Sequence, residues 1–147
     1  MDDPLIGQNL GNYRIDSVIG RGGMATVYYG FDENLHRPVA VKVIDARYRD
    51  NPTYAERFVQ EARSVATWRH ENILQVFSAG QQDDLYYFAM EFVDGPDLSQ
   101  VMNGYIADGE LMPHDDVVKI GRAVAAALDY AHQQDIIHRD VKPSNIM

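Results

Sequence analysis

The chain has 147 residues, of which 46% are hydrophobic and 24% are charged, a balance typical of a globular protein with one modest core. It contains no cysteine, which excludes disulfides, zinc–thiolate sites and cysteine nucleophiles. The formal net charge of -9 argues against broad nucleic-acid binding, because such a field repels phosphate backbones.

The first third of the chain is rich in β-branched and aromatic residues, which favour strands. The predicted strands are Tyr13–Ile19, Val27–Phe31 and Pro38–Ile44. The third strand alternates, with three valines on one face and Lys42 between Ala40 and Ile44 on the other. Lys42 is therefore expected on a largely apolar face.

A helix is predicted to begin at Asn51-Pro-Thr, with Glu61 at the edge of its apolar stripe. The stripe consists of Tyr54, Phe58, Ala62, Val65 and Trp68. Two strand-like runs follow, at Ile73–Phe77 and Leu85–Phe92, joined by the polar segment 78–84.

The last third of the chain is predicted to be helical. Asp97 is a possible N-cap of a short helix, and a long helix begins at Pro113. The order of elements indicates an α+β fold with five antiparallel strands and one helix, followed by the first helices of a second lobe. We divide the chain into an extension (1–12), a sheet lobe (13–93) and the start of a helical lobe (94–147), with a boundary near Gly95-Pro96.

The segment Gly20-Arg-Gly-Gly-Met-Ala-Thr-Val27 joins the first two strands. Glycines allow backbone N–H groups to approach a phosphate without interference from side chains. A flexible hairpin turn without any ligand explains the same residues, so the motif alone does not decide between the two.

Lys42 needs either solvent or an anion, because a buried, unpaired ammonium group is costly. Glu61, on the helix expected to pack against the sheet, is a candidate partner for it. An ion pair between them would hold the ammonium group where phosphate oxygens could reach it. The alternative is that both side chains are solvated.

The segment His138-Arg-Asp-Val-Lys-Pro-Ser-Asn145 gathers a carboxylate, a cation and an amide within six residues, Asp140 to Asn145. Phosphoryl transfer needs such groups to orient a hydroxyl, to face the transferred phosphoryl group and to bind Mg²⁺. The same residues in random order would form an ordinary solvated loop.

Together these three motifs resemble the protein kinase signature set, over about residues 13–147. The resemblance implies that the residues of the glycine-rich loop cover the ATP phosphates and that Lys42, paired with Glu61, contacts the α- and β-phosphates. The loop residues are Ile19, Gly20, Arg21, Gly22, Gly23, Met24, Ala25, Thr26 and Val27. Ala25 stands where the family has a third glycine, and we expect it to be tolerated if its φ is negative.

The resemblance also implies an adenine site. Val27 and Ala40 would lie above the base and Met147 below it. Met90 would be the gatekeeper, Glu91 to Val93 the hinge, and Asp97 a contact to the ribose.

For catalysis, the resemblance implies that Asp140 is the base, Lys142 stabilises the γ-phosphate and Asn145 binds Mg²⁺. Lys142-Pro-Ser-Asn resembles the serine/threonine branch of the family, and its surroundings resemble the eukaryotic-like kinases of bacteria. Val65, Val76 and His138 match positions of the regulatory spine, although ordinary core packing explains them equally well.

The cofactors implied are ATP and Mg²⁺, and the implied partner is a protein with a serine or threonine acceptor. Because Lys42, Glu61, Asp140 and Asn145 are all present, we expect the parent kinase to be active. The chain stops before any Asp-Phe-Gly, so we expect the fragment to be inactive alone. The alternative is an inactive nucleotide-binding or scaffolding fragment. The acidic start lacks a signal-peptide layout and no run is long enough to span a membrane, so a cytoplasmic location is expected unless segments outside the chain anchor it.

Overall fold

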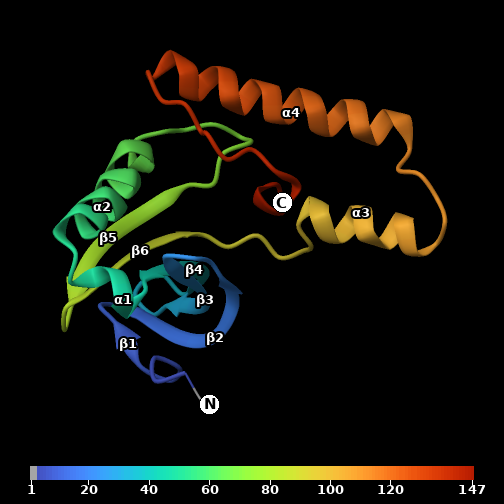
Figure 1. The fold of residues 1–147 in the computed structure, drawn as a ribbon. Coiled ribbons are helices and arrows are strands. Elements are labelled where there is room, and N and C mark those ends of the chain that lie inside the picture. The colour runs from blue at the N-terminus through green and yellow to red at the C-terminus, as the bar shows by residue number, and fades with distance from the viewer. Residues whose placement is uncertain (1–2) are drawn as a thin grey trace. The chain divides into compact units, whose positions relative to one another are not determined.

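The computed structural model describes residues 3–147 (Figure 1). These residues fall into two compact units. The sheet unit comprises the chain up to Arg69 together with Leu74–Phe92, and the helical unit comprises His70–Ile73 together with Val93–Met147.

The sheet unit is a six-stranded antiparallel sheet in the order β1-β2-β3-β4-β6-β5 with two helices (Figure 1). It confirms the predicted kinase-like arrangement and adds a short strand and a short helix to it. The strands are β1 (Asn9–Leu10), β2 (Tyr13–Arg21), β3 (Ala25–Asp32), β4 (Arg37–Ile44), β5 (Val76–Gln82) and β6 (Leu85–Glu91). The helices are α1 (Ala46–Arg49) and α2 (Pro52–Ala66).

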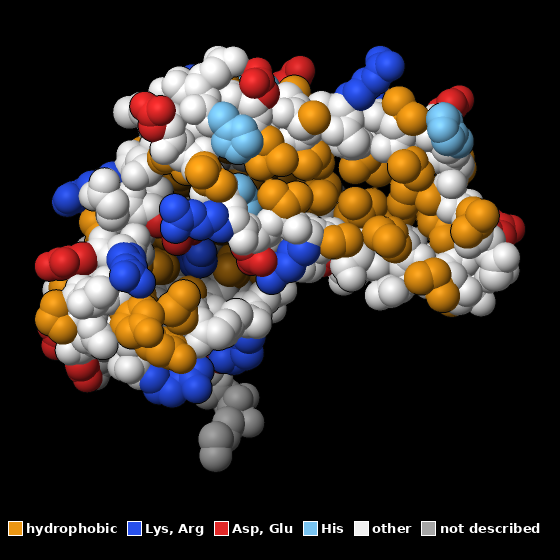
Figure 2. Space-filling view, turned by 45° about the horizontal axis from the view of Figure 1, so that its top comes forward, with side chains coloured by type: hydrophobic (Ala, Val, Ile, Leu, Met, Phe, Trp, Pro, Cys, Tyr) orange, Lys and Arg blue, Asp and Glu red, His pale blue; other side chains and the backbone are white. Residues whose placement is uncertain are grey.

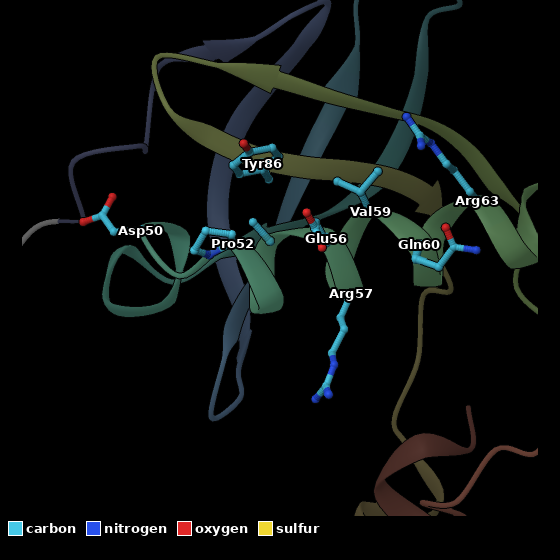
Figure 3. A pocket seen from close by; sticks show the side chains of 9 residues that line it. Asp50, Pro52, Glu56, Arg57, Val59, Gln60, Arg63 and Tyr86 are labelled. Atoms are coloured by element: carbon cyan, nitrogen blue, oxygen red, sulfur yellow. The ribbon is translucent and has the colours of Figure 1, made fainter.

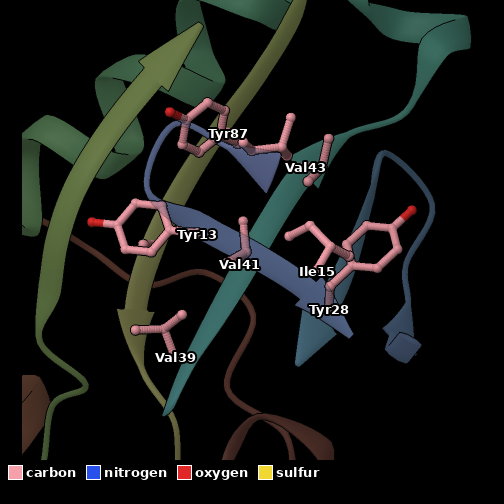
Figure 4. Packing of buried hydrophobic residues seen from close by; sticks show 9 residues of the cluster. Tyr13, Ile15, Tyr28, Val39, Val41, Val43 and Tyr87 are labelled. Atoms are coloured by element: carbon pink, nitrogen blue, oxygen red, sulfur yellow. The ribbon is translucent and has the colours of Figure 1, made fainter. Parts of the chain in front are cut away.

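Each face of the sheet carries its own apolar cluster, as the alternation in β4 predicted. The three valines of β4 pack with residues such as Ile15 and Tyr28 on one face (Figure 4). On the other face, Ile44 and Phe88 pack against α2, and the rings of Phe58 and Phe88 lie 5.0 Å apart. Lys42 is on this second face, whose apolar residues hold α2 in place.

The prediction for β5 was wrong in its bounds. Ile73 lies outside the strand, and the segment expected to be a loop is paired in β5 up to Gln82. The turn consists of Asp83 and Asp84 alone, which have φ values of 49° and 63°. Aspartate tolerates this left-handed region, and a two-residue turn of this kind matches the twist of paired strands, so the hairpin closes tightly.

The segment before β2 is part of the sheet unit. Leu10 is 2% exposed, and Leu5 packs against the cluster that contains the β4 valines. Helix α1 is a single turn capped by Asp45, whose carboxylate accepts a hydrogen bond from the backbone N–H of Arg47.

Helix α2 begins as predicted, with Asn51 as the N-cap and Pro52 at the first position. Ala55, Phe58 and Ala62 are its buried residues. Trp68, which the predicted stripe included, is buried but lies beyond the end of the helix.

The helical unit contains α3 (Leu98–Ala107), α4 (His114–Gln133) and the 3₁₀ turn η1 (Pro143–Asn145). Asp97 caps α3 as expected, in a reciprocal pair of hydrogen bonds with Gln100. Apolar side chains remain exposed in this unit, for example Ile106 (69%) and Leu111 (92%), and they gather on the surface formed by α3 and α4 (Figure 2). Neither helix, nor any other in the described part of the chain, has the length and apolar character needed to cross a bilayer.

Candidate active site

The pairing of β3, β4 and β6 places four of the expected nucleotide contacts on one face of the sheet. Lys42 is directly opposite Val27 on β3, and Ala40 is directly opposite Met90 on β6. Residues opposite each other in antiparallel strands share a face, and residues two apart in one strand do so as well. The side chains of Val27, Ala40, Lys42 and Met90 therefore lie on the α2 side of the sheet.

Lys42 forms an ion pair with Glu61 on this face. The Lys42 Nζ lies 3.2 Å from Oε1 of Glu61 and 5.4 Å from the centre of the Phe88 ring. The neighbour of Glu61, Ala62, is 1% exposed against the sheet, which fixes the register of α2. The Lys42 side chain is 28% exposed and that of Glu61 is 61% exposed, so the pair lies at the edge of the apolar cluster, open to a ligand.

The glycine-rich turn is fixed by two backbone hydrogen bonds. The N–H of Gly22 donates to the carbonyl of Ala25, and the N–H of Asp45 donates to the carbonyl of Met24, each at 2.9 Å. Ala25 does not have a positive φ, which meets the condition for its tolerance, and its side chain is buried in the cluster on the α2 side.

Gly20 and Gly23 of this turn are not required by the protein's own packing, whereas a Cβ added at Gly22 would lie 3.3 Å from the carbonyl oxygen of Ala25. A Cβ added at Gly23 would meet nothing within 4 Å, and one at Gly20 would meet only the Val27 side chain at 3.9 Å. By contrast, a Cβ at Gly30, on β3, would lie 2.5 Å from the carbonyl oxygen of Arg14. The open space at Gly20 and Gly23 is what close approach of a ligand to the backbone requires.

Two residues of the turn direct their side chains away from Lys42. Arg21 is opposite Thr26, in the pair that follows Gly20–Val27 in the β2–β3 ladder. Because successive residues of a strand face opposite sides, the side chains of Arg21 and Thr26 lie on the face opposite the Lys42–Glu61 ion pair. The Arg21 Nη2 lies 2.9 Å from the carboxylate of Asp3. Only the backbone of these two residues can therefore contribute to a phosphate site on the α2 face. Ile19 and Met24 are exposed, at 47% and 53%.

In the helical unit, Asp140, Lys142 and Asn145 form one cluster. The Asp140 carboxylate lies 3.1 Å from the Lys142 Nζ, and the Asn145 amide donates to the Asp140 carbonyl at 2.8 Å and to its carboxylate at 3.3 Å. The hydrogen bond from Lys142 is the main cause that lowers the pKa of Asp140 below its ordinary value, and the field of Lys142 lowers it further. Asp140 is therefore an ionised hydrogen-bond acceptor at neutral pH.

His138 supports the same loop, because its Nδ1 accepts a hydrogen bond from the Asp140 N–H at 3.2 Å. The spine roles of Val65, Val76 and His138 remain predictions. Val76 is buried in the cluster on the α2 side of the sheet and Val65 packs against it, whereas His138 is exposed.

The loop end also holds two expected nucleotide contacts close together. The carbonyl of Ile146, which precedes Met147, accepts a hydrogen bond from the N–H of Leu98 at 2.8 Å, next to Asp97. The Oδ1 of Asp97 caps α3, which leaves its other oxygen for a ligand. The backbone N–H and carbonyl of Val93 have no hydrogen-bond partner among residues 3–147, whereas the N–H of Glu91 donates to the carbonyl of Gln75.

The residues present fit a Mg²⁺ ion that takes most of its ligands from phosphate oxygens and water and only a few from the protein. Because the Asn145 nitrogen donates to Asp140, its amide oxygen is the free end and can serve as a ligand. Over the described range there is no group of three or more acidic or histidine side chains that could hold a metal. Asn145 would therefore supply part of the coordination, with phosphate oxygens and water as the usual remainder.

A hollow of about 650 Å³ lies along α2 in the sheet unit (Figure 3). Pro52, Val59 and Arg63 of the helix and Tyr86 of β6 are among the residues that line it. It includes neither Lys42 nor Glu61, so we assign it no part in the candidate site.

Sequence reasoning missed two residues that hold the glycine-rich turn. Asp3 pairs with Arg21, and Asp45 bonds to Met24 through its N–H. No pattern in the sequence connects Asp3 to a turn 18 residues away, because the contact depends on how the N-terminal segment runs along β2.

Comparison with known proteins identifies protein kinases by family model and by sequence relatives. The family model described as "Protein kinase domain" matches residues 13–147. The chain is 40% identical over 144 residues to the serine/threonine-protein kinase PrkC of Bacillus subtilis and 39% identical over 139 residues to PknB of Mycobacterium leprae, covering 97% and 92% of this chain. It spans about a fifth of the length of these curated relatives, 22% of each.

The fold is also similar to that of solved protein kinase domains. A crystal structure of the Mycobacterium tuberculosis PknI kinase domain superimposes with a TM-score of 0.78 at 34% identity. The match covers 95% of this chain and 55% of that chain.

Proposed function

The chain belongs to the protein kinase domain family, and we propose that the protein carrying it transfers the γ-phosphate of ATP to serine or threonine hydroxyls of proteins. The observation that carries this proposal is the Lys42–Glu61 ion pair on the face that also holds Val27, Ala40 and Met90. An ammonium group fixed at the edge of an apolar face is suited to a ligand with an apolar base and an anionic tail.

On this proposal, the sheet unit binds the nucleotide. The adenine lies against Val27 and Ala40. Val93, which belongs to the helical unit, has backbone groups that are free to bind an adenine edge. Lys42 contacts the α- and β-phosphates, and the backbone N–H of Gly23 faces the phosphates where the turn has room.

The helical unit supplies the residues for transfer. Asp140 accepts a hydrogen bond from the substrate hydroxyl, orients it toward the γ-phosphate and takes its proton. Lys142, which is 3.1 Å from Asp140, places a positive charge near the transferred group. Asn145 binds Mg²⁺ through its amide oxygen, and the ion, when bound, neutralises charge that develops on the phosphate oxygens.

Two lines of evidence support the serine/threonine assignment. Lys142 occupies the position that resembles the serine/threonine branch, and the relatives at 36–40% identity bear the name serine/threonine-protein kinase. We assign no nucleic-acid partner, because the net charge of -9 opposes phosphate backbones. The protein substrate is defined only by its acceptor hydroxyl.

The test uses the full-length protein that carries this chain, with γ-labelled ATP, Mg²⁺ and a generic protein substrate. We expect label on serine or threonine, and we expect Asp140→Asn to abolish transfer while nucleotide still binds. Asp129→Asn is the matched control, because Asp129 is an exposed carboxylate on α4 that accepts a hydrogen bond from Gln133. Full turnover in Asp140→Asn would remove Asp140 from the mechanism. Nucleotide binding without transfer in the wild type would favour a binding module instead.

A further inference from the structure

The segment before β2 runs along the edge of β2 toward the glycine-rich turn. Leu10 is opposite Tyr13, and Asn9 is opposite Arg14. The contact continues beyond β1, because the N–H of Ile15 donates to the carbonyl of Gln8 at 2.9 Å and the N–H of Gly7 donates to the carbonyl of Ile15 at 2.8 Å. The segment thus covers an edge that would otherwise be unpaired.

The segment is anchored at both of its ends. Leu10 is buried, and Leu5 packs against the cluster that contains the β4 valines. Between them a turn closes, in which the N–H of Gln8 donates to the carbonyl of Leu5 at 3.0 Å. This turn brings Asp3 to the end of β2, where the glycine-rich turn begins.

Asp3 there bonds to two side chains from different strands. Its carboxylate accepts hydrogen bonds from Nη2 of Arg21 at 2.9 Å and from the hydroxyl of Tyr28 at 3.0 Å. The Asp3 side chain is 9% exposed, although that of Arg21 is 62% exposed. Burial and the hydrogen bond to Asp3 raise the pKa of Tyr28 to about 12, so this hydroxyl remains a donor at neutral pH.

We propose that residues 3–10 form a strap that fixes the glycine-rich turn through the contact of Asp3 with Arg21 and Tyr28. The inference rests on the proposed function in one respect, namely that the turn binds nucleotide phosphates. Asp3 is then a positioning residue, which acts through Arg21 on the backbone N–H groups and touches no ligand. A turn held in its binding geometry loses less conformational entropy when the nucleotide binds.

The contact with Asp3 explains why the Arg21 side chain points away from the proposed phosphate site. Arg21 is in the turn expected to cover the phosphates, yet its guanidinium lies on the opposite face of the sheet from Lys42. Its partner there is a nearly buried carboxylate, so Arg21 anchors the turn to the rest of the sheet unit. The bond from the Asp45 N–H to the Met24 carbonyl holds the tip of the same turn from its other side.

The test compares Asp3→Asn, Arg21→Gln and their combination in the 147-residue chain. The rate of amide hydrogen exchange at Gly22 and Asp45 measures how often the two backbone hydrogen bonds of the turn open. Titration with Mg-ATP measures the affinity for the nucleotide. We expect exchange to become about two- to fivefold faster and binding weaker by a similar factor, the size typical of an ion pair near the surface. Because the two changes remove one contact, their effects should not add. Tyr28→Phe, which removes only the second donor, should give a smaller change in the same direction.

Asp16→Asn is the matched control, since Asp16 also pairs with an arginine of β2, Arg14 at 2.8 Å, but far from the turn. Unchanged exchange in Asp3→Asn would overturn the strap, and faster exchange with unchanged affinity would overturn its role in nucleotide binding. If the wild-type 147-residue chain bound no Mg-ATP, nucleotide binding by this chain alone would be excluded and the proposed function would be judged on the full-length protein, whereas the exchange data would still decide whether Asp3 holds the turn.

Discussion

The Lys42 ammonium lies 3.2 Å from the Glu61 carboxylate. This ion pair joins strand β4, in the centre of the sheet, to helix α2. The two residues are 19 positions apart, and the packing of Phe58 and Ala62 against the sheet brings them together. The pair is too exposed to contribute much to folding, because ion pairs of this kind are worth about 0–1 kcal/mol. Its value is that it holds a cation in place beside an apolar surface.

Replacement of Lys42 tests this role directly. We expect Lys42→Met to reduce phosphate transfer by a large factor in the full-length protein, because the phosphates lose their cation. The free energy of unfolding should change by about 1 kcal/mol or less, since the methionine can remain along the Phe88 ring. Initial rates and urea unfolding measure the two effects. Lys119→Met, on α4, is the control, and unchanged kinetics in Lys42→Met would contradict phosphate anchoring.

Glu61→Gln should have a weaker effect than Lys42→Met. The amide can still accept a hydrogen bond from Lys42, but the charge that favours its position is lost. We expect weaker Mg-ATP binding with an unchanged melting temperature, since the Glu61 side chain is 61% exposed. Calorimetric titration measures the affinity, and Glu56→Gln on the same helix is the control. A melting temperature that falls while affinity stays constant would show that the pair is only structural.

Two glycine substitutions should distinguish a glycine that leaves room for a ligand from a glycine that the packing of the sheet requires. Gly23→Ala should leave the free energy of unfolding within about 1 kcal/mol of wild type, because its Cβ meets nothing, yet it should weaken Mg-ATP binding severalfold. Gly30→Ala should destabilise the fold by roughly 1–3 kcal/mol, because its Cβ would lie 2.5 Å from the Arg14 carbonyl. Urea unfolding and nucleotide titration of both variants provide the comparison. Normal ATP affinity in Gly23→Ala would show that the ligand does not approach the turn there.

The acid dependence of stability should include a contribution from Asp45. Its hydrogen bonds with Arg47 lower its pKa from 3.8 to about 2. Since the folded pKa lies below the unfolded one, the ionised carboxylate stabilises the fold above pH 3.8, and this contribution disappears as the pH falls toward about 2.

Urea unfolding of wild type and Asp45→Asn between pH 2 and 6 measures this effect. The difference between the two should be largest near pH 6 and shrink at low pH. A difference that does not vary with pH would mean that the charge of Asp45 plays no part.

The sequence was sufficient to predict the parts of the fold that periodic patterns determine. Alternation in β4 placed Lys42 on the α2 face, and the helical spacing of Phe58 and Ala62 placed Glu61 within reach of it. The residue types and spacing in His138–Asn145 indicated the Asp140, Lys142 and Asn145 cluster, since these residues are close in the chain and share one loop.

The features that sequence reasoning missed depend on tertiary contacts. Strand β1 has only two residues, too few to show an alternation, and it pairs because Leu10 is buried beneath the sheet. Strand β5 contains Gly80 and two glutamines, which favour a loop by composition, but pairing with β6 overrides that preference. The contact of Asp3 with Arg21 has no local signature at all.

The most direct test is whether Lys42 and Lys142 reach the phosphates of one bound nucleotide. The chain has three lysines, Lys42, Lys119 and Lys142, so an acyl phosphate of ATP, which acylates amines near its terminal phosphate, can be mapped by mass spectrometry. In the full-length protein with Mg²⁺, we expect acylation of Lys42 and Lys142, protection of both by excess ATP with the same midpoint, and no ATP-dependent labelling of Lys119. If ATP protected only one of the two, or protected them at different concentrations, the two lysines would not share a nucleotide and the proposed transfer reaction would be contradicted.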